Sequence, residues 1–359
     1  MNTTNELIHR PAHGMGGNQR PKKSLCVNVQ QHRGNTLTFS QDILEGNVRA
    51  AARLIRLLDD QDEQVRGELG ELYRHSGRAH VVGFTGAPGV GKSTLVDGII
   101  ARFRKDGKTV GVLAVDPTSP FSGGAILGDR VRMQRHFLDD GVFIRSLATR
   151  GNFGGLSRST MDAVVVLDAL GKDVVILETV GVGQDEVDIA QSAHTTVLVT
   201  IPGMGDDIQA IKAGLMEIGD ILVVNKADRE GASRTVRELR FMQQMSMDCR
   251  SNEGWVAPII ETVAVTGQGL ESLYQAIVKH REYLLESGAQ KLRAIEHARI
   301  KNQLIDIIKE TLAKKVLEEG GGAARLDEMV EKIVDRQTDP YEAARDLVNL
   351  FMRRASHES

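Results

Sequence analysis

The chain has 359 residues, enough for about two domains at roughly 150 residues each. Its 45 basic and 48 acidic residues nearly balance, which argues against a bulk nucleic-acid binder, because such proteins usually carry a basic excess. Two cysteines exclude a disulfide scaffold and favour a reducing compartment, and no apolar run approaches the roughly 18 residues of a membrane span. We expect a cytoplasmic protein, with the mitochondrial matrix as the alternative that a basic N-terminal tail allows.

Changes in composition predict four regions along the chain. Residues 1–39 are polar and basic, which is typical of a disordered or loosely ordered tail. Residues 40–78 have helical spacing and predict an N-terminal extension of two helices, the first capped by Ser40 and continuous from Ile43 to Ile55. Residues 79–285 alternate strand-like and helix-like segments. Residues 286–359 predict a helical arm for association, or else helices that simply pack on the parent domain.

Seven segments rich in Val and Ile predict the strands of a mainly parallel α/β sheet, because helix-like stretches separate them. These segments are Val81–Thr85, Val110–Val115, Val142–Leu147, Val174–Glu178, Thr196–Ile201, Ile221–Val224 and Ile259–Val265.

A glycine-rich loop follows the first of these strands and precedes a helix. It matches G-x-x-x-x-G-K-S/T, whose backbone N–H groups wrap a β-phosphate. In this motif Lys92 reaches the β- and γ-phosphates, and the hydroxyl of Ser93 ligates Mg²⁺. The predicted phosphate-binding residues are Gly86, Ala87, Pro88, Gly89, Val90, Gly91, Lys92, Ser93 and Thr94.

The base-binding side is predicted from an N-K-x-D motif at the end of the sixth strand, formed by Asn225, Lys226 and Asp228. The carboxylate of Asp228 can accept from N1–H and the 2-amino group of guanine, and adenine lacks both donors. The stem of Lys226 can cover the base. A third base-side loop is predicted at residues 262–267, with Val263, Ala264 and Val265 as its base-binding residues. GTPases usually place a Ser-Ala pair there, so only backbone contact is expected from this loop.

Three carboxylates are candidates for the metal and for catalysis. Asp116 and Glu178 end strands, and Asp129 lies in a loop. Side chains at the carboxyl edge of a parallel sheet face the ligand, and Mg²⁺ prefers oxygen ligands. We expect Ser93 and one or two of these acids to hold Mg²⁺. Lys92, Asp116 and Glu178 are the predicted catalytic residues.

Three further segments carry a family resemblance. Residues 178–184 read Glu-Thr-Val-Gly-Val-Gly-Gln where Ras-like GTPases have D-x-x-G. Residues 115–120 read Val-Asp-Pro-Thr-Ser-Pro, and residues 202–214 read Pro-Gly-Met-Gly-Asp-Asp-Ile-Gln-Ala-Ile-Lys-Ala-Gly. Together with the two nucleotide motifs they resemble the MeaB/ArgK/MMAA group of P-loop GTPases over roughly residues 40–355. These are G-protein chaperones of adenosylcobalamin-dependent acyl-CoA mutases.

This resemblance implies a sheet like that of signal-recognition GTPases and a homodimer formed through the helical arm. It implies that Asp116, Asp129 and Glu178 form the acidic set that senses Mg²⁺ and phosphate, and that residues 201–212 are a switch. The implied partner is methylmalonyl-CoA mutase or a close relative, whose cofactor delivery the protein would gate and which it would protect. Asp185 and Asn152 depart from the family pattern of Ser and His, in segments that would face the partner.

The mechanism expected from these residues is slow GTP hydrolysis that a partner accelerates, because no Gln directly follows Gly181 to orient water. Two functions remain as alternatives. A nickel-type metallochaperone GTPase would carry Cys/His motifs near its switches. A transport-associated kinase would use ATP, against which the N-K-x-D motif argues. A scaffold with an inactive nucleotide site is a weaker alternative, because Lys92 and Ser93 are both present.

Overall fold

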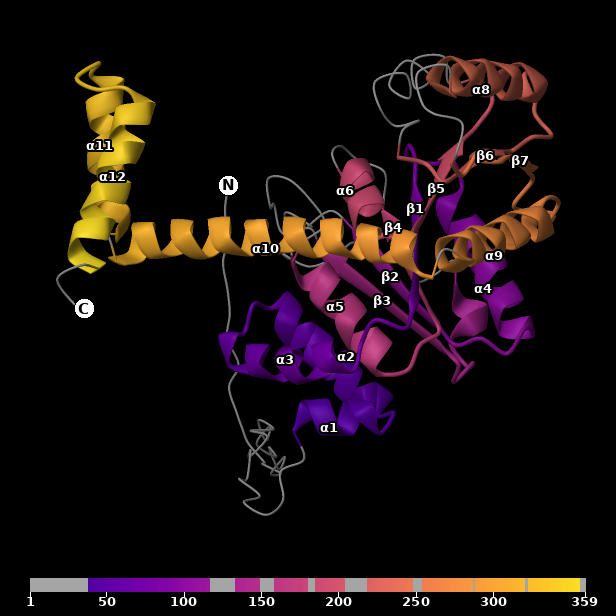
Figure 1. Ribbon diagram of the computed structural model, residues 1–359, viewed down its shortest axis with the longest axis horizontal. Helices are drawn as coiled ribbons and strands as arrows, with labels where there is room; N and C mark the ends of the chain where they lie inside the picture. The colour runs from indigo at the N-terminus through magenta and orange to yellow at the C-terminus, as the bar shows by residue number, and fades with distance from the viewer. Residues whose placement is uncertain are drawn as a thin grey trace, which may run out of the picture. The chain divides into compact units, whose positions relative to one another are not determined.

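One sheet of seven parallel strands organises residues 80–262 (Figure 1), in the order β3-β2-β4-β1-β5-β6-β7. The computed structural model describes residues 38–116, 133–148, 158–179, 185–203, 218–247, 254–286, 288–319 and 322–355. The strands are β1 (His80–Thr85), β2 (Val110–Asp116), β3 (Val142–Ala148), β4 (Val174–Thr179), β5 (Thr195–Thr200), β6 (Ile221–Asn225) and β7 (Ile259–Thr262). The predicted parallel α/β sheet is confirmed.

The seventh strand is shorter than predicted. It ends at Thr262, whereas the sequence predicts a strand that continues to Val265. The carbonyl of Val263 accepts hydrogen bonds from the N–H groups of Thr266 and Gly267, and these bonds turn the chain away from the sheet. The apolar run therefore continues past the strand into a loop.

Helices cover both faces of the sheet. On one face lie α4 (Lys92–Lys105) and α9 (Leu270–Glu286), and on the other lie α5 (Arg158–Ala169) and α6 (Asp185–Ser192). Helix α8 (Ala232–Met247) contacts β6 and β7. The short 3-10 helix η3 (Gln134–His136) precedes β3. Helices thus flank a buried sheet, as the Val- and Ile-rich strands require.

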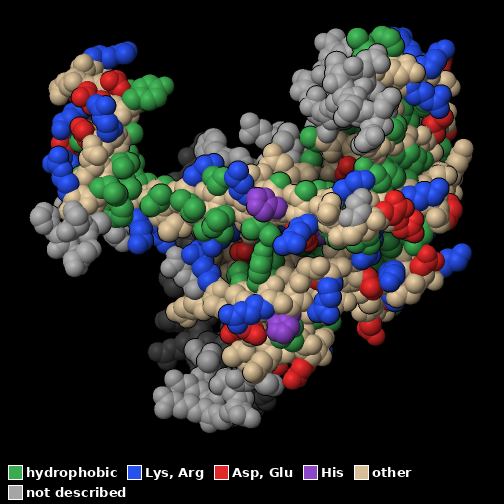
Figure 2. Space-filling view, in the orientation of Figure 1, with side chains coloured by type: hydrophobic (Ala, Val, Ile, Leu, Met, Phe, Trp, Pro, Cys, Tyr) green, Lys and Arg blue, Asp and Glu red, His purple; other side chains and the backbone are tan. Residues whose placement is uncertain are grey.

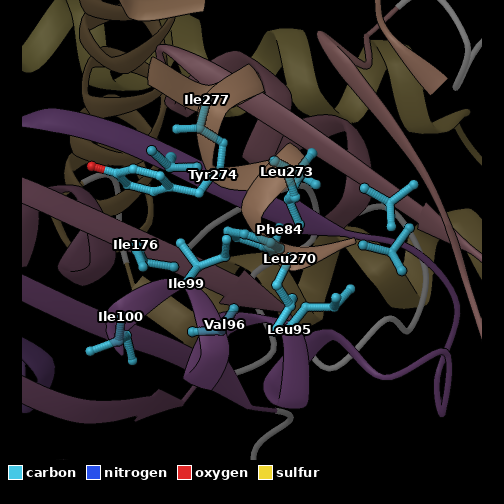
Figure 3. Close-up of a cluster of buried hydrophobic side chains, with 14 of the residues drawn as sticks. Phe84, Leu95, Val96, Ile99, Ile100, Ile176, Leu270, Leu273, Tyr274 and Ile277 are labelled. Carbon is cyan, nitrogen blue, oxygen red and sulfur yellow. The ribbon is translucent and has the colours of Figure 1, made fainter. Parts of the chain in front are cut away.

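The largest core cluster lies between the sheet, α4 and α9 (Figure 3). Phe84 of β1, Ile99 of α4 and Leu273 of α9 are completely buried there. Burial of one such side chain contributes about 2 kcal/mol. Gly98 lets the two helices approach closely, because a Cβ at this position would lie 2.5 Å from Leu270 Cδ1. The core fixes α4, and with it the loop that leads into α4.

The N-terminal helices differ in detail from the prediction. They are α1 (Phe39–Leu44), α2 (Val48–Asp59), the 3-10 turn η1 (Glu63–Val65) and α3 (Arg66–Arg74), and they pack against α5. Ser40 lies inside α1, and Thr38 is the N-cap residue, so the prediction of Ser40 as cap is wrong. Gly46 breaks the expected continuous helix with a φ of 91°, and the side chain of Asn47 caps α2. The predicted tail falls almost wholly on residues 1–37, outside the described residues.

The C-terminal region is helical, as predicted, and consists of α10 (Gln290–Glu319), α11 (Gly322–Val334) and α12 (Pro340–Ala355). Asp339 caps α12 by accepting hydrogen bonds from the N–H groups of Tyr341 and Glu342 at 2.8 and 3.0 Å. Pro340 takes the first helical position, where its fixed φ and missing N–H suit the start of a helix. None of the helices within the described segments is long and apolar enough to cross a membrane.

Helix α10 contacts α6 and α9, and its Glu310 lies 3.7 Å from Arg158 at the start of α5. Another face of α10 leaves apolar side chains exposed, as the hydrophobic surface along this helix in Figure 2 shows. Ile300, Leu304, Ile308 and Leu312 follow one another at four-residue steps and are 41 to 55% exposed. Side chains at this spacing share one helix face, so α10 presents an apolar stripe (Ile300, Leu304, Ile308 and Leu312).

Candidate nucleotide site

The predicted phosphate-binding loop connects β1 to α4 at the carboxyl edge of the sheet. Gly91 immediately precedes α4 with a φ of 100°, and Gly86 has a φ of 134°. A Cβ on Gly86 would lie 2.1 Å from the carbonyl oxygen of Val199, and one on Gly91 would lie 2.4 Å from Asn225 Nδ2. Both positions therefore exclude side chains. The strand, loop and helix have the context that a phosphate-binding loop requires.

The two polar side chains that begin α4 are buried within this loop. Lys92 is 5% exposed, and its Nζ donates to the carbonyl oxygens of Gly86 and Ala87 at 2.5 and 3.0 Å. The hydroxyl of Ser93, also 5% exposed, donates to Glu178 Oε1 at 2.5 Å. The ammonium group thus lies inside the loop, and the hydroxyl lies against a carboxylate at the positive end of α4.

Glu178 reaches Ser93 because β4 is the neighbour of β1. Phe84 and Glu178 are register partners, and Glu178 is 2% exposed. Asp116 ends β2, the strand on the other side of β4, so its backbone lies at the same sheet edge. A hydroxyl oxygen and a carboxylate oxygen in contact suit Mg²⁺, which prefers oxygen ligands. Asp129 lies outside the described residues.

The base-side residues are tied to the phosphate loop through Asn225, which ends β6. Its Nδ2 donates to the carbonyl oxygen of Val90 at 2.7 Å. Its Oδ1 accepts from Thr262 Oγ1 at 3.0 Å and from the N–H of Ala264 at 3.1 Å. Asn225 is 2% exposed, so these bonds are shielded from water. One buried amide therefore joins three loops.

A second tie comes from Lys226, whose Nζ donates to the carbonyl oxygen of Gly89 at 2.8 Å. Its backbone adopts a φ of 55°, an uncommon conformation for a residue with a side chain. Asp228 is exposed, which leaves its carboxylate accessible to a base. In the third loop Val263 is buried, whereas Val265 is 84% exposed.

Thr262 opens the predicted base-side loop, but the sequence assigned it no role in the site. It is completely buried at the end of β7, and it is the register partner of Asn225. Its hydroxyl holds the amide of Asn225, and its carbonyl oxygen accepts from the N–H of Ala227 at 3.0 Å. The sequence predicted a strand that continues to Val265, so it did not place the Thr262 hydroxyl at the carboxyl edge of the sheet.

Several predicted features fall outside the described residues. They include Asn152, Gly181, most of the predicted switch at residues 201–212, and the side chains of Asp116 and Asp185. Within the described part of the chain, no group of three His, Cys, Asp or Glu side chains is arranged to hold a metal ion.

Comparison with known proteins identifies the family. Residues 51–321 match the family model described as methylmalonyl Co-A mutase-associated GTPase MeaB. A protein of Pyrococcus horikoshii named as a GTPase is 51% identical over 85% of this chain and 94% of its own length. The mitochondrial methylmalonic aciduria type A homolog of Mus musculus is 31% identical over 76% of this chain and 66% of its own length.

A solved structure supports the fold. The crystal structure of a protein described as LAO/AO transport system kinase superposes with a TM-score of 0.59 and covers 88% of this chain and 96% of its own. The identity between the two is 22%, so the likeness concerns the fold alone. The resemblance inferred from the motifs is therefore confirmed by the family match and the named relatives, and the chain belongs to the MeaB family of GTPases, enzymes that bind and hydrolyse GTP.

Proposed function

We propose that this GTPase is a chaperone of an adenosylcobalamin-dependent acyl-CoA mutase, with methylmalonyl-CoA mutase as the first candidate. In this role it gates delivery of the mutase cofactor and protects or reactivates the mutase. The description of the family and the mouse relative named for methylmalonic aciduria support this assignment. The observation that carries it is the match of residues 51–321 to the family model of a methylmalonyl Co-A mutase-associated GTPase. The bridge of Asn225, which joins the phosphate loop to the base-side loop, supports the nucleotide-dependent part of this role.

The buried residues of the phosphate loop would act by positioning and by charge. Lys92 would exchange the carbonyl oxygens of Gly86 and Ala87 for phosphate oxygens, because an ammonium group binds a charged acceptor more strongly than a neutral one. Ser93 and Glu178 would hold Mg²⁺, with Asp116 at the same edge. When bound, this ion neutralises developing charge on the phosphates. We infer slow hydrolysis by the isolated protein and faster hydrolysis when the partner completes the site.

The preference for GTP over ATP and the rate of GTP hydrolysis test the roles of the two nucleotide motifs. Asp228→Asn replaces one acceptor oxygen with a donor amide and should weaken GTP binding about 100-fold relative to ATP, since a guanine donor then faces another donor. Lys92→Ala, made as a separate variant, should abolish GTP hydrolysis. Competition between GTP and ATP for a fluorescent nucleotide measures the first effect, and phosphate release measures the second. Unchanged GTP affinity in Asp228→Asn would refute the base-reading role.

The partner is tested by capture from the native lysate with the full-length protein. One sample contains GDP and another contains a non-hydrolysable GTP analogue. Lys92→Ala serves as the control variant, for which the recovered partners should be the same with either nucleotide. Recovery of a B12-dependent acyl-CoA mutase that changes with the nucleotide would support the chaperone role and name the mutase. Recovery of a nickel enzyme or a transport component, without any mutase, would contradict it.

We also propose that residues 286–359 are a homodimerisation arm. The apolar stripe of α10 supports this, since its four side chains remain 41 to 55% exposed in the single chain. A row of exposed apolar side chains on one helix face is the kind of surface that marks protein–protein interaction sites. A second copy of the same stripe would bury both, with the same patch used by each subunit.

A further inference from the structure

A chain of buried polar side chains lies at the amino edge of the sheet, opposite the nucleotide site. His80 begins β1 and Thr195 begins β5, and His80 Nε2 lies 2.7 Å from Thr195 Oγ1. The same hydroxyl lies 2.9 Å from Nδ1 of His280 on α9. His280 Nε2 lies 3.5 Å from Oδ1 of Asp220, the residue before β6. We call these four residues, His80, Thr195, His280 and Asp220, the basal chain.

The basal chain is closed to solvent at one end and open at the other. His80, Thr195 and His280 are at most 3% exposed, whereas the side chain of Asp220 is 35% exposed. Oδ2 of Asp220 also accepts from the N–H of Thr196 at 2.8 Å. A proton from water can therefore reach this chain at Asp220.

The charge on Asp220 acts on one end of the basal chain. With Asp220 ionised, the Nε2–H of His280 faces its carboxylate, the hydroxyl of Thr195 donates to His280 Nδ1, and His80 Nε2–H donates to Thr195. A proton that binds to Asp220 stays on the carboxyl group and removes its negative charge. The attraction between Asp220 and the Nε2–H of His280 is then weakened, while the two hydrogen bonds of Thr195 keep their direction.

Histidine 194 connects this edge of the sheet to α10. Its Nδ1 accepts from the backbone N–H of Val81 at 3.1 Å, so its proton must reside on Nε2. That nitrogen lies 3.9 Å from Glu296 Oε1 on α10. The imidazole of His194 is stacked on that of His80, with 6.2 Å between the ring centroids and 4° between the planes. Thus Glu296 of α10 lies beside a ring that is parallel to that of His80 in the basal chain.

Aromatic side chains make a second connection to α10. Trp255 Nε1 donates to the carbonyl oxygen of Asp220 at 2.7 Å, and its ring centroid lies 4.7 Å from that of His280 and 5.3 Å from that of Tyr283. Nζ of Lys291 in the first turn of α10 lies 3.5 Å from the centroid of the Tyr283 ring. The residues that join α9 to α10 include Gly288 and Ala289, both with positive φ.

We propose that the basal chain is a proton-responsive joint, which takes up one proton near neutral pH and thereby alters how α10 is held against the sheet. The electrostatics support this reading. Burial raises the pKa of Asp220 to about 7 and lowers the pKa of His280 to about 4, so the added proton resides on Asp220. Burial also lowers the pKa of His80 and of His194, which stay neutral. The other charged or titratable groups facing the cluster are Arg281, Tyr283, Lys291, Glu296 and Arg299.

The first test uses the fluorescence of Trp255, the single tryptophan of the chain. Emission from the full-length, nucleotide-free protein should change between about pH 8 and pH 6 with a midpoint near 7, because the indole contacts both Asp220 and His280. Asp220→Asn should remove this transition, and His280→Gln, which keeps a hydrogen-bonding side chain, should remove or shift it. His75→Gln is the exposed-histidine control. A flat wild-type signal, or a transition retained in both variants, would overturn the proposal.

The second test asks whether α10 is coupled to protonation of the basal chain. If protonation alters how α10 is held, then a change of charge on α10 must in turn shift the pH at which the basal chain is protonated. Lys291→Met removes a positive charge and should raise the midpoint of the Trp255 transition. Glu296→Gln removes a negative charge and should lower it, each by about a few tenths of a pH unit. Lys301→Met changes an exposed charge on the same helix and should leave the midpoint in place. If the first two variants shift the midpoint no more than the control, α10 is not part of the joint.

Discussion

Gly91 lies where the phosphate loop, the side-chain amide of Asn225 and the first turn of α4 meet. Substitution of glycines in this loop can distinguish the effect of a steric clash from the cost of an unfavourable backbone conformation. Gly91→Ala places a Cβ 2.4 Å from Asn225 Nδ2, which must then leave its buried acceptor on Val90. We expect GDP affinity to fall by about 3 kcal/mol, or roughly 100-fold. Isothermal titration calorimetry with GDP measures this loss.

The matched control is Gly89→Ala in the same loop. Gly89 also has a positive φ, 76°, but a Cβ there meets nothing within 4 Å. This variant should lose only the backbone term of about 1 kcal/mol. Equal losses in the two variants would show that conformation alone, and not contact with Asn225, makes Gly91 necessary.

The role of the Thr262 hydroxyl can be tested by a substitution that keeps the shape of the side chain. Thr262→Val removes the hydroxyl that donates to Asn225 Oδ1, while the N–H of Ala264 still donates to the same oxygen. Because one of two donors remains, we expect GDP binding to weaken by about 1 kcal/mol, near fivefold. Thr338→Val, beside the C-terminal helix, provides the control for the same change elsewhere. An unaltered GDP affinity in Thr262→Val would mean that Ala264 holds Asn225 unaided.

At the residue scale, the sequence predicted the participants of the site but not the bonds between them. Lys92, Ser93 and Asn225 were found because their motifs have fixed spacing and a strand at a known offset. The contact between Asn225 and Val90 joins residues 135 positions apart, and no periodicity signals such a contact. Thr262 was given no role because a threonine in a strand is also typical of an ordinary strand residue.

At the scale of elements, His194 in the turn between α6 and β5 makes the free energy of unfolding depend on pH. Burial lowers the pKa of His194 to about 3, below its ordinary value of 6.5. Below pH 6.5 the unfolded chain binds a proton that the folded protein does not, so folding stability is lost as pH falls from 6.5 toward 3. This histidine accounts for about 1.4 kcal/mol per pH unit over that range.

His194→Gln should therefore reduce the acid sensitivity of the unfolding free energy by about 1.4 kcal/mol per pH unit below pH 6.5. Glutamine can still accept from the N–H of Val81, so the fold should survive. Urea unfolding at about pH 7.5, 6.5 and 5.5 measures the slope. The exposed His297→Gln is the control, and a slope identical to that of the wild type in His194→Gln would contradict the assignment.

Helices and strands were predicted most reliably where a single sequence pattern indicated them. Runs of Val and Ile located all seven strands, because strands buried on both faces need apolar residues throughout. Errors arose where two signals competed. The apolar residues from Ile43 onward suggested one helix, but Gly46 and the capping side chain of Asn47 divide it. Val263 has the composition of a strand residue, yet its carbonyl oxygen closes a turn.

At the scale of the whole molecule, the apolar stripe of α10 predicts the oligomeric state. Leu304→Asp places a charge at the centre of the stripe, on a side chain already 55% exposed in the single chain. The folded subunit should tolerate it, whereas a homodimer that buries this stripe should dissociate, since an unpaired buried charge costs several kcal/mol. Light scattering after size-exclusion chromatography gives the mass.

Thr311→Asp, also exposed on α10, is the control for the added charge. It should leave the mass unchanged, and circular dichroism should show the same helix content in both variants. A dimer that persists in Leu304→Asp would remove the stripe from the interface. A monomeric wild-type protein would contradict the homodimer itself.

Contacts between distant segments set the limit of what could be predicted for the whole chain. The basal chain joins His80 to Thr195 across 115 positions, and Thr195 to His280 across 85. Each residue alone is ordinary at its place in the sequence. Only the strand order, which brings β1 and β5 together at the amino edge of the sheet, makes them neighbours.

The strand order also has a consequence for protein synthesis. β1 is the first strand of the described sheet to leave the ribosome, yet its two neighbours in the sheet are β4 and β5. Its apolar residues therefore wait without partners while β2 and β3 are made, and the second side of β1 is covered only after Thr200 has emerged. Nascent chains that expose unpaired strands are prone to aggregate. A protein whose proposed role is to protect another enzyme would thus depend on protection itself during translation, until its own central strand is enclosed.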